Sequence, residues 1–96
     1  MTELNSIQQI LSQLKPELAR KFFVRSIGLF GSVVRDDFSP DSDIDIIVDF
    51  SKPVGVEFID LANYMETILK KKVDLVSKRG LKPKYFQQIQ PEIIYV

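Results

Sequence analysis

The sequence predicts a small α/β domain, with residues 1–96 forming a single folded unit. Amphipathic stretches, in which apolar residues recur at intervals of three and four, alternate along the chain with short runs rich in isoleucine and valine. This alternation favours helices interleaved with strands. The apolar fraction of 45% and the lack of low-complexity tracts are typical of a globular chain. We therefore expect a helix layer and a sheet layer around one core.

The first element is an amphipathic helix, because apolar residues recur at helical spacing from Leu4 to Leu14. Pro16 has no backbone N–H, and its ring clashes with the preceding helical turn. It is therefore expected to end this helix at about Lys15, or to begin a short second turn that runs through Arg20.

A short strand is predicted next, at residues 26–30, and a glycine ends it. Gly31 breaks the apolar run, and Ser32 is a residue type that caps helices, so a short helix is expected from here to about Asp37. Residues 38–42 contain a proline and two serines, which predicts a loop.

The clearest strand spans residues 43–50, and it contains three aspartates. Strand side chains alternate between two faces, so Asp43, Asp45 and Asp49 share one face with Ile47, and the other face is apolar. Burying an unpaired carboxylate is costly. A positive group is therefore expected to meet Asp43 and Asp45.

The rest of the chain alternates in the same way. The predicted elements are a helix from Val56 to about Lys71, a strand at residues 73–77, a turn at Arg79 and Gly80, a short helix at residues 83–90, and an apolar segment at residues 92–96.

Composition excludes several functional classes. The sequence has no cysteine and no histidine, which excludes the usual zinc sites and the Ser-His and Cys-His nucleophile pairs. A formal net charge of zero argues against binding driven by phosphate neutralisation, so no direct DNA binding is expected. No run of about 18 apolar residues predicts a membrane span, and the N-terminus lacks a signal-peptide pattern. A cytoplasmic protein is therefore expected.

The basic residues are unevenly distributed, and seven of the thirteen lie between Lys70 and Lys84. Two interpretations remain open for them. They form a solvated surface, or they form a basic wall for phosphates or for an acidic partner.

Asp43 and Asp45 predict a divalent metal site. Carboxylates two residues apart in a strand stand about 6.5–7 Å apart on one face, which suits one divalent ion or two ions ~3.5–4 Å apart. Oxygen ligands favour Mg²⁺ or Mn²⁺, and Mg²⁺ completes its shell with water and substrate phosphate, which predicts a nucleotide. If the strand at residues 73–77 is a neighbour, Asp74 can join as a metal ligand and as the base for an attacking hydroxyl.

Gly31 and Ser32 predict the phosphate end of the site. A strand that stops at glycine and opens a helix exposes backbone N–H groups at a positive helix end, where an anion can bind. Arg35 lies one turn further on. It either helps to hold phosphate or pairs with an aspartate of the cluster, and the sequence favours neither role.

Together these segments resemble a known family. The patterns G31-S32-x-x-R35, S42-D43-I44-D45 and V73-D74-L75 resemble the nucleotidyltransferase superfamily typified by DNA polymerase beta, in particular the minimal nucleotidyltransferase (MNT) proteins of prokaryotes. The resemblance implies a small mixed sheet with helices packed on one side. It also implies a nucleoside triphosphate at Gly31, Ser32 and Arg35, with divalent ions on Asp43, Asp45 and Asp74.

The resemblance also implies a reaction and a partner. An acceptor hydroxyl would attack the α-phosphorus of ATP, with pyrophosphate leaving. MNT proteins are antitoxins of HEPN-domain toxins, which implies transfer of AMP to a tyrosine of such a toxin within a hetero-oligomer. Val34 and Asp36 depart from the G-S-x-A-R-G pattern common in the family. Two alternatives remain: an antitoxin that inhibits by binding alone, and a nucleotidyltransferase that acts on a small molecule.

Overall fold

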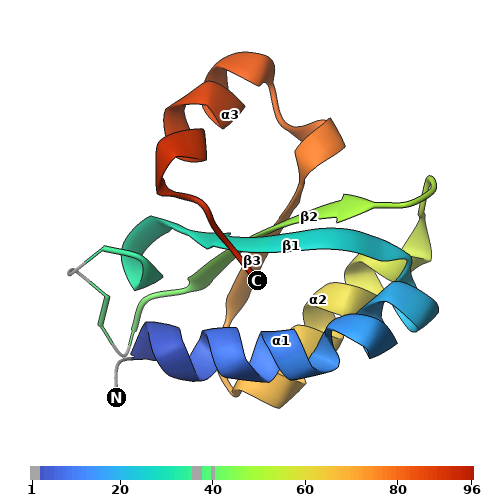
Figure 1. Cartoon of the computed structure of the whole chain (residues 1–96), viewed down its shortest axis with the longest axis horizontal. Helices are drawn as coiled ribbons and strands as arrows, with labels where there is room; N and C mark the ends of the chain where they lie inside the picture. Colours follow the sequence, from blue (N-terminus) through green and yellow to red (C-terminus); the bar gives the residue numbers. More distant parts are fainter. Residues whose placement is uncertain (1–2, 36–37, 40) are drawn as a thin grey trace.

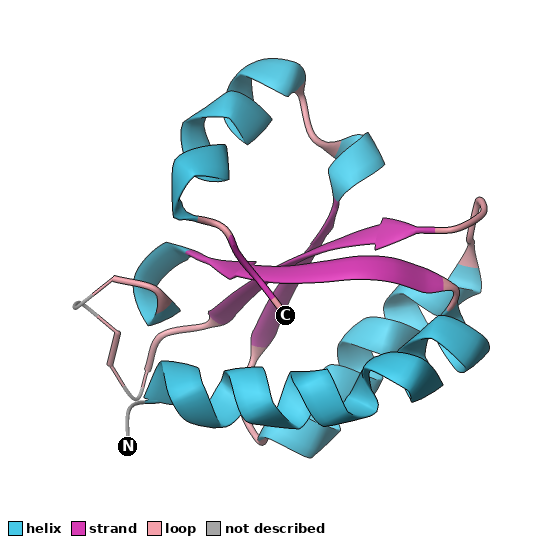
Figure 2. Cartoon of the chain, viewed as in Figure 1, coloured by secondary structure: helices cyan, strands magenta, loops and turns pink. Residues whose placement is uncertain are grey.

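Three helices and a four-stranded sheet make up the fold (Figures 1 and 2). The computed structural model describes residues 3–35, 38–39 and 41–96. In chain order the elements are α1 (Glu3–Phe22), β1 (Val24–Phe30), the 3₁₀ turn η1 (Gly31–Val33), β2 (Ile44–Phe50), α2 (Val56–Leu69), β3 (Val73–Ser77), the 3₁₀ turn η2 (Lys78–Gly80), α3 (Pro83–Ile89), the 3₁₀ turn η3 (Gln90–Glu92) and β4 (Ile94–Tyr95).

The sheet is mixed, as predicted, with the strand order β3-β2-β1-β4. β1 runs antiparallel to β2 and β4, whereas β2 and β3 are parallel. Asp45 is paired with Phe30 on one side and with Asp74 on the other. The end of β1 and the starts of β2 and β3 therefore meet at one edge of the sheet.

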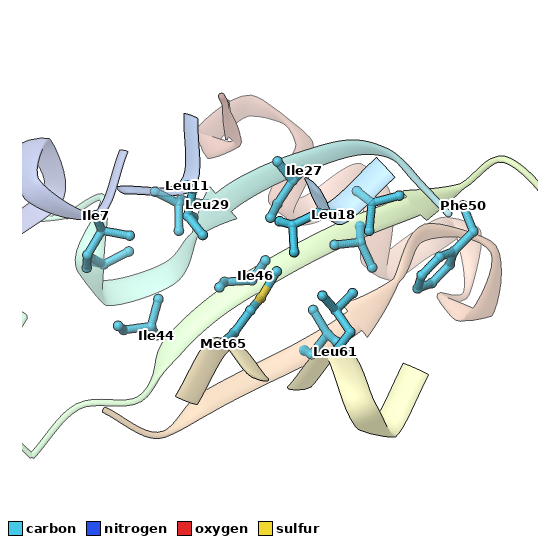
Figure 3. Close-up of a cluster of buried hydrophobic side chains, with 14 residues drawn as sticks. Ile7, Leu11, Leu18, Ile27, Leu29, Ile44, Ile46, Phe50, Leu61 and Met65 are labelled. Atoms are coloured by element: carbon cyan, nitrogen blue, oxygen red, sulfur yellow. The ribbon is translucent and has the colours of Figure 1, made fainter. Parts of the chain in front are cut away.

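The main core lies between the sheet and helices α1 and α2. Figure 3 shows this cluster, in which Ile46 lies next to Met65 of α2. The predicted apolar face of β2 supplies its centre, and every one of its members is buried: Ile44, Ile46, Val48 and Phe50.

A second, smaller core covers the opposite face of the sheet. Ile47 points away from Ile46 and packs with Phe30 and with Ile89 of α3. Figure 1 shows α3 on the side of the sheet opposite α1 and α2. The prediction of a mixed sheet with helices on one side therefore holds for α1 and α2, while α3 covers part of the face that carries the aspartates.

The first helix corrects the prediction for Pro16. α1 is one continuous helix of 20 residues with Pro16 inside it, and it neither stops at Lys15 nor begins a separate turn. Leu11 and Leu18 lie seven residues apart on the buried side, and both are fully buried. This packing on both sides of the proline outweighs the loss of one backbone hydrogen bond, because most helix stability in proteins comes from the buried face.

The other observed helix and strand boundaries differ little from the predicted ones, with one exception. β1 begins two residues earlier than expected, α2 ends at Leu69, and the helix predicted at 83–90 is α3. The exception is the helix predicted from Ser32 to about Asp37, which is a 3₁₀ turn of only three residues, Gly31–Val33. Phe30 occupies its N-cap position without a side-chain hydrogen bond, and Val34 and Arg35 lie beyond the turn. Asp36 and Asp37 lie outside the described residues. No helix in the described part of the chain is long and apolar enough to cross a membrane.

Candidate active site

Three aspartates lie together at the edge of the sheet where β2 and β3 begin. Asp43 is exposed and immediately precedes β2. Asp45 is the second residue of β2 and is half-buried. Asp74 is exposed on β3 and lies directly beside Asp45 in the parallel register. Neighbouring strands are about 4.8 Å apart, so Asp45 and Asp74 lie side by side, and Asp43 is near enough for its charge to affect Asp45.

The electrostatics of Asp45 agree with this proximity. The pKa of Asp45 is raised to about 6, chiefly by burial and additionally by the negative charges of Asp74 and Asp43. Asp74 is also a hydrogen-bond partner of Asp45. The carboxylates therefore repel one another, and a cation bound between them would relieve the repulsion.

The donor set fits a hard cation that keeps part of its own shell. Among residues 3–35, 38–39 and 41–96, no three acidic side chains are already gathered closely enough to enclose a metal ion. Mg²⁺ needs only one or two protein carboxylates when phosphate and water supply its other ligands. The open arrangement of Asp43, Asp45 and Asp74 is consistent with that kind of binding.

Gly31 brings the turn at Gly31–Val33 into direct contact with Asp45. Its φ is +77°, in the left-handed region that favours glycine. A Cβ atom on Gly31 would lie 2.0 Å from Oδ2 of Asp45, so no larger residue fits while Asp45 keeps its position. Glycine at this position therefore allows the turn to approach the Asp45 carboxylate closely.

Glu92 of η3 is a member of the site that the sequence did not reveal. The backbone N–H of Gly31 donates a hydrogen bond to Oε1 of Glu92 (2.9 Å), and Nη1 of Arg35 donates to Oε2 (3.3 Å). One carboxylate thus holds the glycine turn and the arginine together. The pairing of β4 with β1 brings Glu92 here, and a two-residue strand leaves too short a pattern to predict it.

Arg35 interacts with both Glu92 and Asp45. Besides its contact with Glu92, its positive charge opposes the rise in the pKa of Asp45. Its guanidinium is about half exposed, at 54%, and so is within reach of a bound ligand. Ser32 is half-buried in the same 3₁₀ turn, which is closed by the N–H groups of Val34 and Arg35 donating to the Gly31 carbonyl (3.0 and 3.2 Å).

The two departures from the family pattern have different outcomes. Val34 packs against the main core, so its larger side chain is accommodated by burial. Asp36 falls outside the described residues.

Asp49 shares the face of Asp45 but belongs to a separate ion-pair cluster. It is buried, with 8% of its surface exposed, and its Oδ2 accepts hydrogen bonds from Arg25. The guanidinium of Arg79 lies 3.6 Å from the other oxygen. The Arg25 hydrogen bond is the main cause of the lowered pKa of Asp49. Asp49, the second aspartate of β2, is therefore neutralised by arginines and is separate from the candidate metal site.

A polar cavity of about 390 Å³ opens beside Asp43. It is lined by two aspartates, one serine and three lysines: Asp41, Ser42, Asp43, Lys70, Lys71 and Lys72. The first lysines of the basic run therefore face the site region. A more apolar cavity of about 260 Å³ lies at the other end of β2, near Phe50 and Phe58.

Comparison with known proteins also indicates a nucleotidyltransferase. Residues 11–96 match the family described as the nucleotidyltransferase domain. The chain is 44% identical over 97 residues to the protein adenylyltransferase MntA of Thermococcus cleftensis, which covers 100% of this chain and 98% of MntA.

Solved structures share the fold. One, assigned as a minimal nucleotidyltransferase, superposes with a TM-score of 0.82 at 30% identity, over 98% of this chain and 95% of the other. A structure of tri-AMPylated Shewanella oneidensis HEPN toxin in complex with MNT antitoxin contains a chain that matches with a TM-score of 0.62 at 26% identity. That match covers 97% of this chain and 67% of the other.

Proposed function

Because the chain belongs to the nucleotidyltransferase domain family, we propose that it is an MNT-type protein adenylyltransferase and antitoxin. It transfers AMP from ATP to a tyrosine hydroxyl of a HEPN-domain toxin and thereby neutralises the toxin. The observation that carries the proposal is the pairing of Asp45 with Asp74 beside the Gly31 turn. The 44% identity to a protein adenylyltransferase and the fold shared with an MNT antitoxin support it.

The residues at one end of the site act on the phosphates, and those at the other end act on the acceptor hydroxyl. The turn at Gly31 and Ser32, with Arg35, binds the β- and γ-phosphates and holds the α-phosphorus near the acids. Asp74 accepts the proton of the acceptor hydroxyl. The acceptor oxygen forms a bond to the α-phosphorus, the bond from that phosphorus to the bridging oxygen breaks, and pyrophosphate leaves.

Asp43, Asp45 and Asp74 would hold Mg²⁺ or Mn²⁺. When bound, the metal ion would neutralise phosphate charge as it develops in the transfer. The raised pKa of Asp45 supports this assignment, because a carboxylate crowded by two others is more stable with a cation than without one. The reaction consumes ATP, and we propose that it takes place in the cytoplasm.

The test combines the chain with its HEPN-domain partner, ATP and Mg²⁺, and follows the intact mass of the partner. The partner should gain adenylate units with the wild-type chain and none with the Asp43→Asn/Asp45→Asn variant. Asp60→Asn is the matched control, because Asp60 is an exposed aspartate on α2.

Two outcomes favour the alternatives. If the Asp43→Asn/Asp45→Asn variant still neutralises the toxin and no mass is gained, the chain acts by binding alone. If the partner gains no mass and a small hydroxyl compound does, the acceptor is a small molecule. Omission of the divalent ion should abolish the mass gain, and transfer in a metal-free buffer would contradict the metal assignment.

A further inference from the structure

The sheet order separates the two ends of the candidate site. β2 lies in the centre, with β1 and its Gly31 turn on one side and β3 with Asp74 on the other. The phosphate turn and Asp74 are therefore on opposite sides of Asp45. Figure 1 shows that β3 begins close to the end of α2.

The geometry of phosphoryl-type transfer gives these two sides different roles. The attacking and leaving oxygens lie roughly in line through the phosphorus. If pyrophosphate leaves toward the Gly31 turn, as in the proposed function, the acceptor hydroxyl must approach from the β3 side. The cavity beside Asp43 lies on that side, because Lys70, Lys71 and Lys72 lead directly into β3.

A backbone hydrogen bond holds the segment of Lys70, Lys71 and Lys72 next to the start of β2. The N–H of Ile44 donates a hydrogen bond to the Lys72 carbonyl (2.9 Å), which fixes Lys72 beside the residue between the two aspartates. Lys70 ends α2 in the left-handed conformation, with φ at 57°. The ammonium group of Lys71 lies 5.5 Å from the ring centroid of Phe38. The position of this basic segment relative to Asp43 is therefore set by the fold.

The cavity is suited to an anionic ligand. Three lysines face two aspartates around its wall, and its volume of about 390 Å³ falls within the range of small-ligand pockets, ~300–1,000 Å³. A divalent ion on Asp43 would increase the excess of positive charge. A neutral or basic acceptor segment would gain little electrostatic attraction from these three lysines.

We propose that this cavity is the acceptor site, and that Lys70, Lys71 and Lys72 recognise acidic residues that flank the acceptor tyrosine of the partner. The inference rests on the proposed function and names the part of the site that selects the acceptor. It assigns the first three lysines of the basic run to an acidic protein segment rather than to the triphosphate.

The test is the Lys70→Glu/Lys72→Glu variant, with Lys82→Glu/Lys84→Glu as its matched control. All four lysines are exposed, and both variants make the same change in net charge. Initial rates of AMP transfer are measured with the acceptor protein varied at saturating ATP, and then with ATP varied. The first variant should raise KM for the acceptor about tenfold, with KM for ATP unchanged, because several attractive charge contacts become repulsive. The control should change neither constant.

Three outcomes would overturn the proposal. A rise in KM for ATP alone would assign the lysines to the triphosphate. Equal effects of both variants would indicate a general effect of net charge, and no effect of either would leave the cavity without a role. Thermal unfolding shows whether the variants fold, and Lys70→Gln/Lys72→Gln replaces the first variant if it does not.

A binding measurement separates this proposal from the proposed function. A tyrosine peptide flanked by aspartates is titrated into the chain, and a lysine-flanked peptide serves as the control. Chemical-shift changes at Ser42 and Lys70–Lys72 with the acidic peptide alone support the acceptor site even if the wild type transfers no AMP. Equal binding of both peptides, or no binding of the acidic peptide, contradicts it.

Discussion

Replacement of Gly31 by alanine tests whether the turn at Gly31–Val33 and the aspartates of the candidate metal site form one unit. The new Cβ would lie 2.0 Å from Oδ2 of Asp45, 2.9 Å from its Cγ and 3.2 Å from its Cβ. Non-bonded heavy atoms prefer separations of about 3.5–4.0 Å, so the carboxylate or the turn must move by roughly 1.5 Å. The left-handed φ of +77° adds a cost of about 1–2 kcal/mol for a residue with a side chain.

The expected result combines a moderate loss of stability with a large loss of activity. A cost of 1 kcal/mol lowers Tm by roughly 4–8 °C in a domain of this size, so the variant should remain folded at 25 °C. A displacement of about 1 Å in a reacting group can cost about 100-fold in rate. We therefore expect kcat/KM for AMP transfer to fall by about 100-fold, measured by intact mass of the acceptor over time.

Gly80→Ala provides the control for this variant. A Cβ on Gly80 would be in ordinary contact with the Cβ of Ser77, at 3.9 Å, and Gly80 does not have a positive φ. This control should transfer AMP at the wild-type rate. If a folded Gly31→Ala protein also transferred AMP at the wild-type rate, the packing of Asp45 against the turn would have no part in the reaction.

Three further predictions concern individual carboxylates. Glu92→Ala should raise KM for ATP several-fold and Glu92→Gln should restore most of the loss, since an amide oxygen still accepts the Gly31 N–H. Glu57→Ala, which removes a similar contact to a glycine N–H elsewhere, should leave KM unchanged. Chiefly through burial, the pKa of Asp45 is raised from its ordinary value of 3.8 to about 6, so Asp45 should make the metal-free protein lose stability as the pH rises from about 4 to 6. Thermal unfolding in a chelator should show a smaller fall for Asp45→Asn, and equal falls would contradict the shift. Asp49→Asn should lower the free energy of unfolding at pH 7 by roughly 1.5–3 kcal/mol through weakening of its charged hydrogen bonds. Because its pKa is lowered in the fold, this difference should shrink in urea titrations as the pH falls below 4.

Local patterns in the sequence were sufficient for most elements and for the central acids. The alternation in residues 43–50 predicted which face of β2 is buried, and the matching context of Asp74 predicted its place beside Asp45. The buried face could be predicted because it depends on a strand's two-residue period, which is written in consecutive residues. The place of Asp74 was predicted only on the condition that β3 is the neighbour of β2, and the structure meets that condition.

Long-range contacts could not be predicted in the same way. Glu92 and Gly31 are 61 residues apart, and their contact depends on the pairing of a two-residue strand. The continuity of α1 through Pro16 depends on core packing around the helix, which local propensity does not include. The placement of α3 over the second face also depends on three separate segments meeting at Ile47, Phe30 and Ile89.

The parallel pairing of β2 and β3 also affects the order in which a newly made chain acquires its chemistry. Two parallel strands cannot be joined by a hairpin, so the chain must cross back through α2 before Asp74 reaches Asp45. Such pairing of distant segments is slow compared with helix formation. During translation, the acidic cluster cannot form until β3 has left the ribosome, and the Glu92 contact requires η3 as well. A nascent chain that ends before these segments should therefore have no capacity to modify a partner.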